Sequence, residues 1–443
     1  MHRILSFLPL LFLFSLKLSA QSGWETVDSV TWQLYAGKQW ESLNEEAKKA
    51  FNQEIDFFYL RVRAGVAAFE MKQYRPAIRH LQKALENSPD DEFVNSYYYT
   101  ALLLAGREDE ANALADRLPV EMLDRYQIRR KEFVSSVTLE TLLSFNGMHR
   151  ALIAEEIDNE GSYSNYRSVL NHMWFKDLGL DHHISPEFNL YHSFSHIAID
   201  RTQRYKSAAY LLDAKKGTNT SQYQYFIQGR LMLWKGWHTT VAYSKVWGKS
   251  YYNYPEYQSD AGYIFPRLSQ GINDHLVTLG IAREMTFMRP RISFTTGKIN
   301  SYRQYQANGQ IILYPLGNLH FYLLSEGIVH SDENCDHTKT LFTQKAGIKG
   351  GPLWLISEGT FGRVSNFSSG DGLVIYNMPE TITGMYGATL WFPLFRYKVN
   401  VAVTYRLYEK TGTTFVYTDA VTYHTKDYDF TDQSVLISLK WNL

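Results

Sequence analysis

The sequence is poor in cysteine and carries no excess of charge. Its 443 residues include a single cysteine, Cys335, so an internal disulfide is excluded. We interpret Cys335 as an isolated thiol in a loop and not as a catalytic nucleophile. Lysine and arginine together number 45, as do aspartate and glutamate, and the formal net charge is zero. No basic surface therefore indicates nucleic-acid binding.

Long apolar helices and familiar catalytic motifs are also missing. Beyond the first 20 residues, no apolar run reaches the roughly 20 residues that a membrane-spanning helix needs. The chain has neither a phosphate-binding glycine loop nor an HExxH motif. The segment 181–183 (Asp-His-His) resembles a metal cluster only in composition, and its position between two predicted strands favours a turn. The sequence therefore indicates no cofactor and no metal site.

The first residues predict a secretory signal peptide over residues 1–20. A basic start, Met1-His2-Arg3, precedes an apolar stretch over 4–18 and the small residues Ser19-Ala20. The alternative is a membrane anchor, for which the apolar stretch is short. No cysteine lies near the predicted cut, which excludes an N-terminal lipid anchor.

Aromatic residues and a two-residue alternation are abundant. Tryptophan, tyrosine and phenylalanine make up 15% of the chain, and barrels use such residues at both membrane interfaces. At the end of the chain Val435, Ile437, Leu439 and Trp441 alternate with mostly polar residues. The alternation recurs from about residue 133 onward, and we predict an antiparallel transmembrane β-barrel of about fourteen strands over 132–443. The predicted strands are 133–146, 163–175, 184–199, 221–234, 237–248, 274–287, 291–300, 307–315, 319–329, 340–349, 353–363, 382–392, 396–408 and 432–443.

Connections of two lengths separate these strands. Short turns such as 235–236 and 350–352 predict a periplasmic end, because outer-membrane barrels place short turns there. The long polar stretches 246–273, 330–338, 364–381 and 409–429 predict outer loops. The tyrosines of one such loop suit contact with a carbohydrate or a protein, or packing back into the barrel mouth; they are Tyr251, Tyr252, Tyr254 and Tyr257.

The alternation also assigns faces to the strands. In 221–234, Tyr223 and Ile227 share the predicted lipid face, while Gln222 and Gln224 face the lumen. A charge at mid-bilayer costs about 2–4 kcal/mol, so charged side chains should point inward. Two interpretations remain open: a gate or substrate contact in the lumen, or an internal salt-bridge network that fills the barrel. The predicted lumenal charged residues are Arg230, Glu326, Glu358, Arg396, Lys398 and Arg406.

The segment before the barrel has a helical pattern that repeats. Residues 37–40 and 71–74 are similar and lie 34 residues apart, and Gly65 and Pro89 stand at defining positions of the middle unit. Residues 24–125 resemble about three tetratricopeptide repeats, which predicts an α-solenoid within a periplasmic domain over 21–131. Its concave face would dock a partner, or its residues only pack the repeats against the barrel mouth. We predict that face from Tyr59, Val62, Val66, Phe69, Tyr97 and Thr100.

Enzymatic candidates are few. The best is the segment Tyr191 to His196, in which His192 and His196 point to one side of a strand and Ser193 and Ser195 to the other. Neighbouring Ser and His on one strand therefore cannot pair, and nothing marks a serine elsewhere for a lipid-modifying enzyme.

The domain order resembles two known groups, the repeat-plus-barrel polysaccharide exporters and the surface lipoprotein assembly modulators. The resemblance implies a non-enzymatic outer-membrane protein, surrounded by lipid, with a periplasmic protein partner and a surface glycan or lipoprotein as cargo. The sequence thus predicts a factor for assembly, export or display of a surface component. The alternatives are a passive channel or surface receptor and, less favoured, a lipid-modifying enzyme.

Overall fold

The computed structural model describes residues 23–155, 163–207, 211–233, 236–260, 262–333, 338–395, 397–419 and 421–443. It divides into two compact units. The first comprises the residues up to Arg130 with two short segments, Met285–Phe287 and Tyr314–Leu319. The second comprises Lys131–Glu284, Met288–Leu313 and His320–Leu443. The predicted signal peptide and Cys335 lie outside the described residues.

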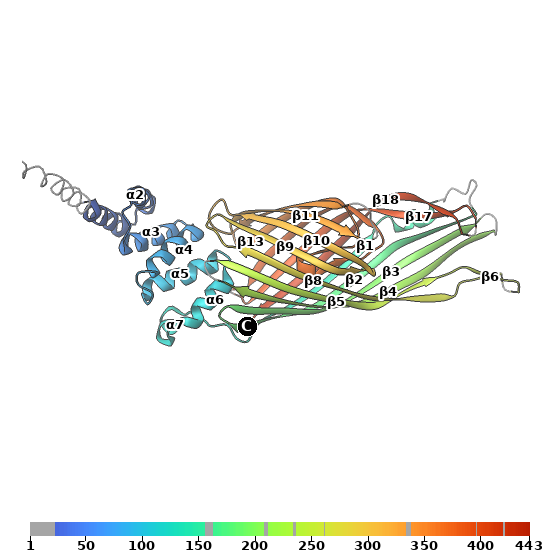
Figure 1. Cartoon of the computed structure of the whole chain (residues 1–443), viewed down its shortest axis with the longest axis horizontal. Coiled ribbons are helices and arrows are strands. Elements are labelled where there is room, and N and C mark those ends of the chain that lie inside the picture. Colours follow the sequence, from blue (N-terminus) through green and yellow to red (C-terminus); the bar gives the residue numbers. More distant parts are fainter. Residues whose placement is uncertain are drawn as a thin grey trace, which may run out of the picture. The chain divides into compact units, whose positions relative to one another are not determined.

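The first unit is helical (Figure 1). Within the described residues, no helix combines the length and hydropathy that crossing a membrane would require. Residues 23–36 are helical, and after them come α2 (Trp40–Asn52), α3 (Phe58–Glu70), α4 (Tyr74–Leu85), α5 (Glu92–Leu104), α6 (Glu108–Arg117) and α7 (Val120–Tyr126).

The ends of three of these helices share one geometry. Lys38, Lys72 and Gly106, which lie 34 residues apart, have positive φ angles of 52°, 60° and 73°. The amide of the residue after each donates to the carbonyl oxygen five residues earlier, at 2.9, 2.8 and 2.9 Å, as left-handed helix caps do. Buried small and apolar residues recur at the same interval: Leu43, Ala77 and Ala111; Ala47, Leu81 and Ala115; and Ala50, Ala84 and Leu118.

Gly65 allows two helices of this unit to pack closely, and Arg75 connects separate parts of it. A Cβ atom on Gly65 would lie 2.7 Å from the side chain of Leu81, so α3 and α4 approach closely only because Gly65 is glycine. Arg75 is 2% exposed and donates to the carbonyl oxygens of Ala105 at 3.3 Å and Met285 at 2.9 Å. It thereby links the helices to one of the short segments of the same unit.

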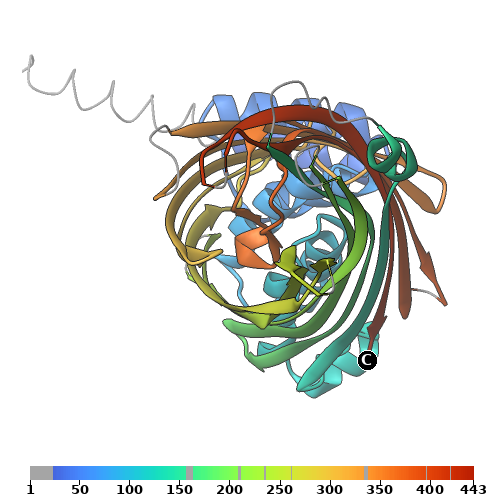
Figure 2. The same ribbon diagram turned by 90° about the vertical axis from the view of Figure 1, so that its right-hand side faces the viewer.

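The second unit is a closed antiparallel barrel whose fourteen strands confirm the predicted number (Figures 1 and 2). The first and last strands pair in register, with Leu139 opposite Leu439, which leaves no open sheet edge. The strands are β1 (Val134–Asn146), β2 (Ser164–Ser185), β3 (Phe188–Ser207), β4 (Leu212–Met232), β5 (Trp237–Asn253), β8 (Arg267–Arg283), β9 (Met288–Ile299), β10 (Tyr302–Leu313), β11 (Phe321–Asp332), β12 (Lys339–Gly350), β13 (Leu353–Val364), β16 (Thr381–Leu394), β17 (Val399–Tyr417) and β18 (Tyr423–Asn442).

Shorter elements lie in the connections. Helix α8 (His149–Ala154) follows β1, and the hairpin β6 (Glu256–Gln258) and β7 (Gly262–Ile264) follows β5. Between β13 and β16 the chain forms β14 (Phe367–Ser369), a 3-10 turn η1 (Gly370–Gly372) and β15 (Val374–Tyr376).

The barrel wall has two heights (Figure 1). We call β2, β3, β4, β5, β8, β17 and β18 the tall wall, because they have 17 to 22 residues. The short wall is β9 to β13 and β16, with 12 to 14 residues each. Above the end of β1, β17 pairs directly with β2, from Thr414 opposite Arg167 to Tyr417 opposite Ser164. A strand needs only about 9–11 residues to cross a bilayer, so the tall wall has residues to spare.

The tall wall corrects two predicted outer loops. The stretch 246–273 is largely strand, because β5 runs to Asn253 and β8 begins at Arg267. The stretch 409–429 is also largely strand, since β17 runs to Tyr417 and β18 begins at Tyr423. In these parts apolar alternation is weak while the hydrogen-bonded ladder continues, which is why the sequence pattern indicated loops.

Candidate functional site: a filled lumen and two chambers

The connection between β13 and β16, residues 365–380, folds into the barrel (Figure 2). We call these residues the plug. The sequence predicted a loop over 364–381, and a connection between strands is found there. The prediction did not include its turn into the barrel (Figure 2). The rings of Phe367 and Tyr376 stack with centroids 4.3 Å apart and nearly parallel planes, so the plug forms a compact turn of its own.

A carboxylate fixes the tip of the plug. Both oxygens of Asp371 accept hydrogen bonds from Nη2 of Arg291 on β9, at 2.6 and 2.7 Å. Oδ2 also accepts from Nε2 of Gln228 on β4, at 2.9 Å. The side chains of Asp371 and Arg291 are each 12% exposed. Charge-assisted bonds of this kind are about twice as strong as neutral ones, so Asp371 links the plug to two parts of the wall.

The plug backbone bonds the wall as well. The Gly372 carbonyl oxygen accepts from Nε2 of Gln224 on β4 at 3.1 Å and from Oγ of Ser244 on β5 at 2.6 Å. Gly372 has a φ of +92°, and a Cβ there would lie 2.9 Å from Ser244 Oγ. The Ser368 carbonyl oxygen accepts from Nε2 of Gln306 on β10 at 2.9 Å. The plug is therefore bonded to both the tall and the short wall.

Apolar contacts complete this packing. Ile375 belongs to a cluster of buried side chains from the tall wall and β9, and Phe367 to one from the short wall. The first cluster contains Val246, Leu276, Ile299 and Ile375, and the second Ile328, Leu341, Val364, Phe367 and Ile382.

A cavity of about 650 Å³ adjoins residues 377–380 of the plug; we call it the polar chamber. Arg201 on β3 forms an ion pair with Glu380 there, with side chains 10% and 3% exposed. Arg201 also donates to Oγ of Ser168 at 3.1 Å. Among the described residues, Nη1 of Arg201, Oε2 of Glu380 and Nε2 of Gln222 are buried without a hydrogen-bond partner. Such atoms favour a polar occupant over an apolar one.

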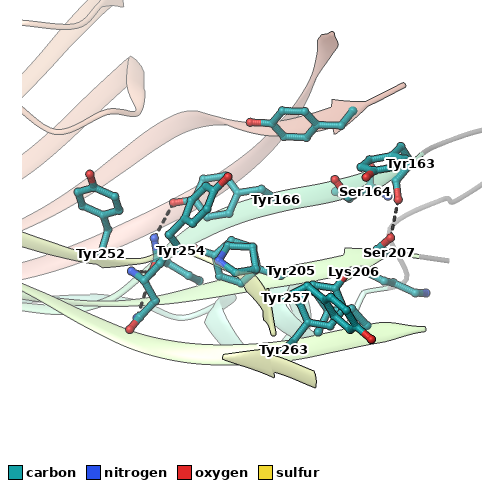
Figure 3. Close-up of a pocket in the computed structure, with 16 residues that line it drawn as sticks. Tyr163, Ser164, Tyr166, Tyr205, Lys206, Ser207, Tyr252, Tyr254, Tyr257 and Tyr263 are labelled. Atoms are coloured by element: carbon teal, nitrogen blue, oxygen red, sulfur yellow. Dashed lines mark hydrogen bonds between the residues drawn. The ribbon is translucent and has the colours of Figure 1, made fainter. Parts of the chain in front are cut away.

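A second cavity, of about 600 Å³, lies among the tall strands. We call it the tyrosine chamber (Figure 3). It shares Tyr166, Gln203 and Tyr252 with the polar chamber, so the two chambers adjoin. Its tyrosines come from β2 and the residue before it, β3, β5, β17 and the β5–β8 connection. They are Tyr163, Tyr166, Tyr205, Tyr252, Tyr254, Tyr257, Tyr263 and Tyr417.

Hydrogen bonds hold part of this chamber in place (Figure 3). Nε2 of Gln203 donates to the Tyr166 hydroxyl at 2.8 Å, and Oε1 of Gln203 accepts from the Asn253 amide at 2.8 Å. The Tyr205 hydroxyl donates to the Asn253 carbonyl oxygen. Burial raises the pKa of Tyr205 and that of Tyr417 above the ordinary value, so both are neutral phenols at physiological pH.

The structure places the predicted lumenal charges in different surroundings. Glu358 forms ion pairs with Arg406 and with Nζ of Lys345, the latter at 2.8 Å. Glu326 accepts from Nδ2 of Asn308 at 3.3 Å, and Arg230 pairs with Asp181 at 3.0 Å.

The two remaining residues predicted for the lumen are Arg396 and Lys398. Arg396 is outside the described residues. Lys398 was expected on a strand, but β17 begins at Val399, and Lys398 lies exposed in the preceding turn. The apolar–polar alternation extended past the strand end, so the sequence pattern could not separate the turn from the strand.

The predicted loop tyrosines meet at the chambers. Tyr252, Tyr254 and Tyr257 line the tyrosine chamber, and Tyr251 lines the polar chamber. The Arg267 guanidinium lies 4.2 Å from the centre of the Tyr251 ring. Sequence reasoning missed Tyr166, Tyr205 and Tyr417, because they lie on strands far from that loop in the sequence.

The helical unit has a groove of its own, of about 450 Å³. Of the six residues predicted for a docking face, Tyr59 and Val62 line it, together with the unpredicted Trp32, Tyr35, Phe58 and Phe93. Val66 is buried. Phe69 and Tyr97 contact each other with ring centroids 5.0 Å apart. The hydroxyl of the exposed Thr100 donates to the Ser96 carbonyl oxygen at 2.9 Å.

The histidines of β3 do not face the serines of the same strand. Ser193 and Ser195 are buried, at 3% and 4% exposed. Nε2 of His192 lies 3.1 Å from Nε2 of His182, and Nε2 of His196 lies 3.1 Å from Oγ of Ser221 on β4. Among the described residues, no carboxylate or amide bonds the other ring nitrogen of His196, and no group of three or more potential ligands could hold a metal ion. The pair lacks the third group that orients a catalytic histidine.

Comparison with known proteins finds distant similarity of fold only. No protein-family model and no curated protein matches the chain. A solved structure of a TodX monoaromatic hydrocarbon channel mutant is 6% identical, with a TM-score of 0.45, over 75% of this chain and 94% of that one. A FadL homologue of Pseudomonas aeruginosa is 8% identical, with a TM-score of 0.42, over 70% and 90%. A bacterial polysaccharide outer-membrane secretin is 7% identical, with a TM-score of 0.34, over 69% and 98%. Similarities this distant do not assign a function.

Proposed function

We propose that this chain is an outer-membrane β-barrel that acts as a gated channel or surface receptor for a small ligand, with the plug as its gate. The observation that carries the proposal is the bonding of Asp371, at the tip of the plug, to Arg291 and Gln228 across the lumen. Because the plug crosses the lumen and is hydrogen-bonded to the wall, it would obstruct a permanently open pore.

The outer surface of the barrel supports the membrane placement. Large apolar side chains on the strands are exposed, among them Ile292 at 64%, Leu355 at 51% and Phe342 at 49%. In water such a surface would be costly, whereas lipid favours it. The short turns between strands then face the periplasm, and the tall wall and both chambers face outward.

The trigger of this gate lies in the polar chamber. Glu380 and Arg201 form an ion pair where the plug rejoins the wall, and both are nearly buried. A polar ligand in this chamber would compete for the same groups. Because a ligand shifts a two-state equilibrium only through differential affinity, binding that breaks this pair would favour the open plug.

The test is ion conductance of the purified full chain in planar bilayers. The chain as it stands should conduct little, and replacing residues 366–379 by a short Gly-Ser linker should raise single-channel conductance severalfold. The matched control replaces the tip of the β5–β8 connection, residues 256–264, which lies outside the plug and should leave conductance unchanged. Equal conductance of the plug-deleted and unaltered chains would contradict a gating plug.

A second candidate follows from the helical unit. Its 34-residue recurrence of caps and buried residues supports tetratricopeptide repeats, and the groove beside Tyr59 offers exposed aromatic surface to a peptide or helix. In this version the unit docks a periplasmic protein, and the barrel assembles, exports or displays a surface glycan or lipoprotein.

Photo-crosslinking separates this candidate from the first. A crosslinking amino acid in place of Tyr59 should capture one defined periplasmic protein. The same substitution at Tyr126, an exposed tyrosine on α7, is the matched control. Capture from neither position, or equally from both, would count against a docking groove.

A further inference from the structure

We propose that the tyrosine chamber is a binding site for a neutral oligosaccharide. The proposal rests on the proposed function, because it names the class of ligand that the barrel would receive.

Tyrosine dominates the lining. Eight of the sixteen lining residues are tyrosine, and the aliphatic ones are Leu212 and Pro255. A tyrosine ring offers an apolar face for contact and a hydroxyl for hydrogen bonding. A pyranose has the complementary construction, with C–H groups on its face and hydroxyls around its rim. A site built from phenols rather than from phenylalanine and leucine therefore suits a sugar.

The polar groups of the chamber have capacity left for a ligand. The Tyr166 hydroxyl accepts from Gln203, which leaves its own proton available as a donor. Among the described residues, the hydroxyls of Tyr252 and Tyr254 take part in none of the hydrogen bonds. Hydroxyls act as donor and acceptor at once, and so they match the hydroxyls of a sugar, which also do both.

The charges of the chamber argue against other ligand classes. Among the lining residues that the structure describes, Lys206 is the one charged residue, and none is a carboxylate. A cationic ligand would meet the like charge of this lysine. A phosphorylated ligand usually receives several cationic or bidentate contacts, and a single lysine supplies less. A hydrocarbon would bury the hydroxyl and amide groups of Tyr166, Gln203 and Asn253 without satisfying further hydrogen bonds.

The position of the chamber makes it accessible. Tyr254 and Tyr257 are 58% and 65% exposed, while Tyr166 and Tyr205 are held by hydrogen bonds on strands β2 and β3. The chamber thus combines a fixed floor with an exposed rim. Its volume of about 600 Å³ lies within the roughly 300–1,000 Å³ of small-molecule sites. Through Tyr166, Gln203 and Tyr252 it adjoins the polar chamber, so a bound sugar lies next to the region of Glu380.

Binding can be measured on the full chain in a detergent without a sugar headgroup. Saturation-transfer NMR and calorimetry would use maltotriose, cellotriose and N-acetylated chitotriose, with toluene as a hydrocarbon and choline as a cation. We expect at least one trisaccharide to bind. Tyr254→Ala should weaken its binding about tenfold, the usual loss for a contact residue worth about 1.4 kcal/mol. Tyr254→Phe, which keeps the ring, should weaken it less.

The control is Tyr126→Ala on α7, which should leave binding unchanged. Circular dichroism verifies that each variant is folded, and so does the resistance of the barrel to unfolding during gel electrophoresis. If Tyr254→Ala fails to fold, Tyr257→Ala at the same rim takes its place. The proposal is overturned if no trisaccharide binds, if toluene or choline binds instead, or if the rim variants bind as the unaltered chain does.

The two proposals can fail separately. If a trisaccharide binds and plug deletion leaves conductance unchanged, the chamber is a sugar site on a barrel that is not gated by its plug. If plug deletion opens the pore and no trisaccharide binds, the gate stands and the sugar assignment is wrong.

Discussion

The tall and short walls follow the same pairing rules but meet different surroundings. On the short wall, outward residues such as Ile292, Phe342 and Leu355 are apolar and exposed. On β4 in the tall wall, the outward face changes along the strand. Tyr223 and Leu231 are apolar and exposed, whereas beyond them Asn219 and Lys215 are polar. The change from apolar to polar outward side chains along β4 thus marks the edge of the lipid-facing surface. Both chambers lie at the tall wall.

This difference also separates two ways of filling a barrel. The short wall supplies the plug, through the connection between β13 and β16, and the tall wall supplies much of the surface that the plug bonds. The short wall is as tall as a membrane requires. The additional length of the tall wall goes to the tyrosine chamber instead.

The largest effect is expected at a buried ion pair of the tall wall. Lys410 on β17 and Asp432 on β18 lie 2.6 Å apart with side chains 8% and 0% exposed. Lys410→Met leaves the carboxylate buried without its partner and should lower the free energy of unfolding by about 3–5 kcal/mol. Urea unfolding in detergent measures this. The matched variant in the short wall is Lys345→Met, which should cost less because Arg406 still pairs with Glu358. Equal losses of unfolding free energy in the two variants would contradict the expected difference between the walls.

A charge on the outer surface should separate the walls directly. Leu355→Arg places a cation on the outward face of the short wall and should destabilise the barrel in lipid by about 2–4 kcal/mol. Gly217→Arg places the same cation on the tall end of β4, where a Cβ meets no atom within 4 Å, and should cost little. Unfolding in lipid vesicles tests both variants. Similar costs would mean that the tall end also lies in lipid.

The tip of the plug joins the two walls, and weakening it should matter less for stability than for opening. Asp371→Asn keeps the shape but replaces a charge-assisted pair, which should cost the closed plug about 1–3 kcal/mol and increase the frequency of openings in bilayers. Glu333→Gln is the control, since its pair with Arg303 is 3.8 Å long and more than half exposed. An unchanged opening frequency in Asp371→Asn would show that Asp371 does not hold the gate.

The smallest effect is expected at the tip of the β17–β18 hairpin. The backbone amides of Thr422 and Val421 bond the Asp419 carboxylate at 2.7 and 2.8 Å and hold its pKa below the usual value of 3.8. The pKa of Asp419 is lower in the folded chain than in the unfolded chain. The stabilisation by these two hydrogen bonds is therefore fully present above the pKa of the unfolded chain, and it is lost as the pH falls through the pKa of the folded chain. Exchange of these two amides, corrected for intrinsic rates, should therefore quicken at acid pH. Asp419→Asn, which does not titrate there, should show no such pH dependence.

The sequence predicts the barrel well where lipid imposes a pattern. All fourteen predicted strands correspond to strands in the structure, because a lipid-facing strand must alternate. It predicts the tall ends poorly: β4 begins at Leu212 rather than 221, and β18 at Tyr423 rather than 432. Where both faces of a strand lie outside the membrane, no side-chain period marks it.

The site could be predicted only in fragments. Tyr252, Tyr254 and Tyr257 were singled out as a tyrosine cluster, but the long-range pairing of β2, β3 and β17 that completes the chamber leaves no local signal. The plug did carry one, because Phe367, Ile375 and Tyr376 are apolar or aromatic residues in a stretch taken for a polar loop. Their mutual contacts, and the Asp371 to Arg291 pair 80 residues apart, depend on the closed barrel.

Because the plug is a connection between β13 and β16, which are adjacent in the sheet, both of its ends are anchored to the rim. It cannot be pulled out as a separate domain could, and no machinery is needed to put it back. If the plug is the gate, as proposed, opening is a rearrangement within a loop of fixed length whose two ends stay attached to neighbouring strands. The length of this loop then sets an upper limit on the width of the opening.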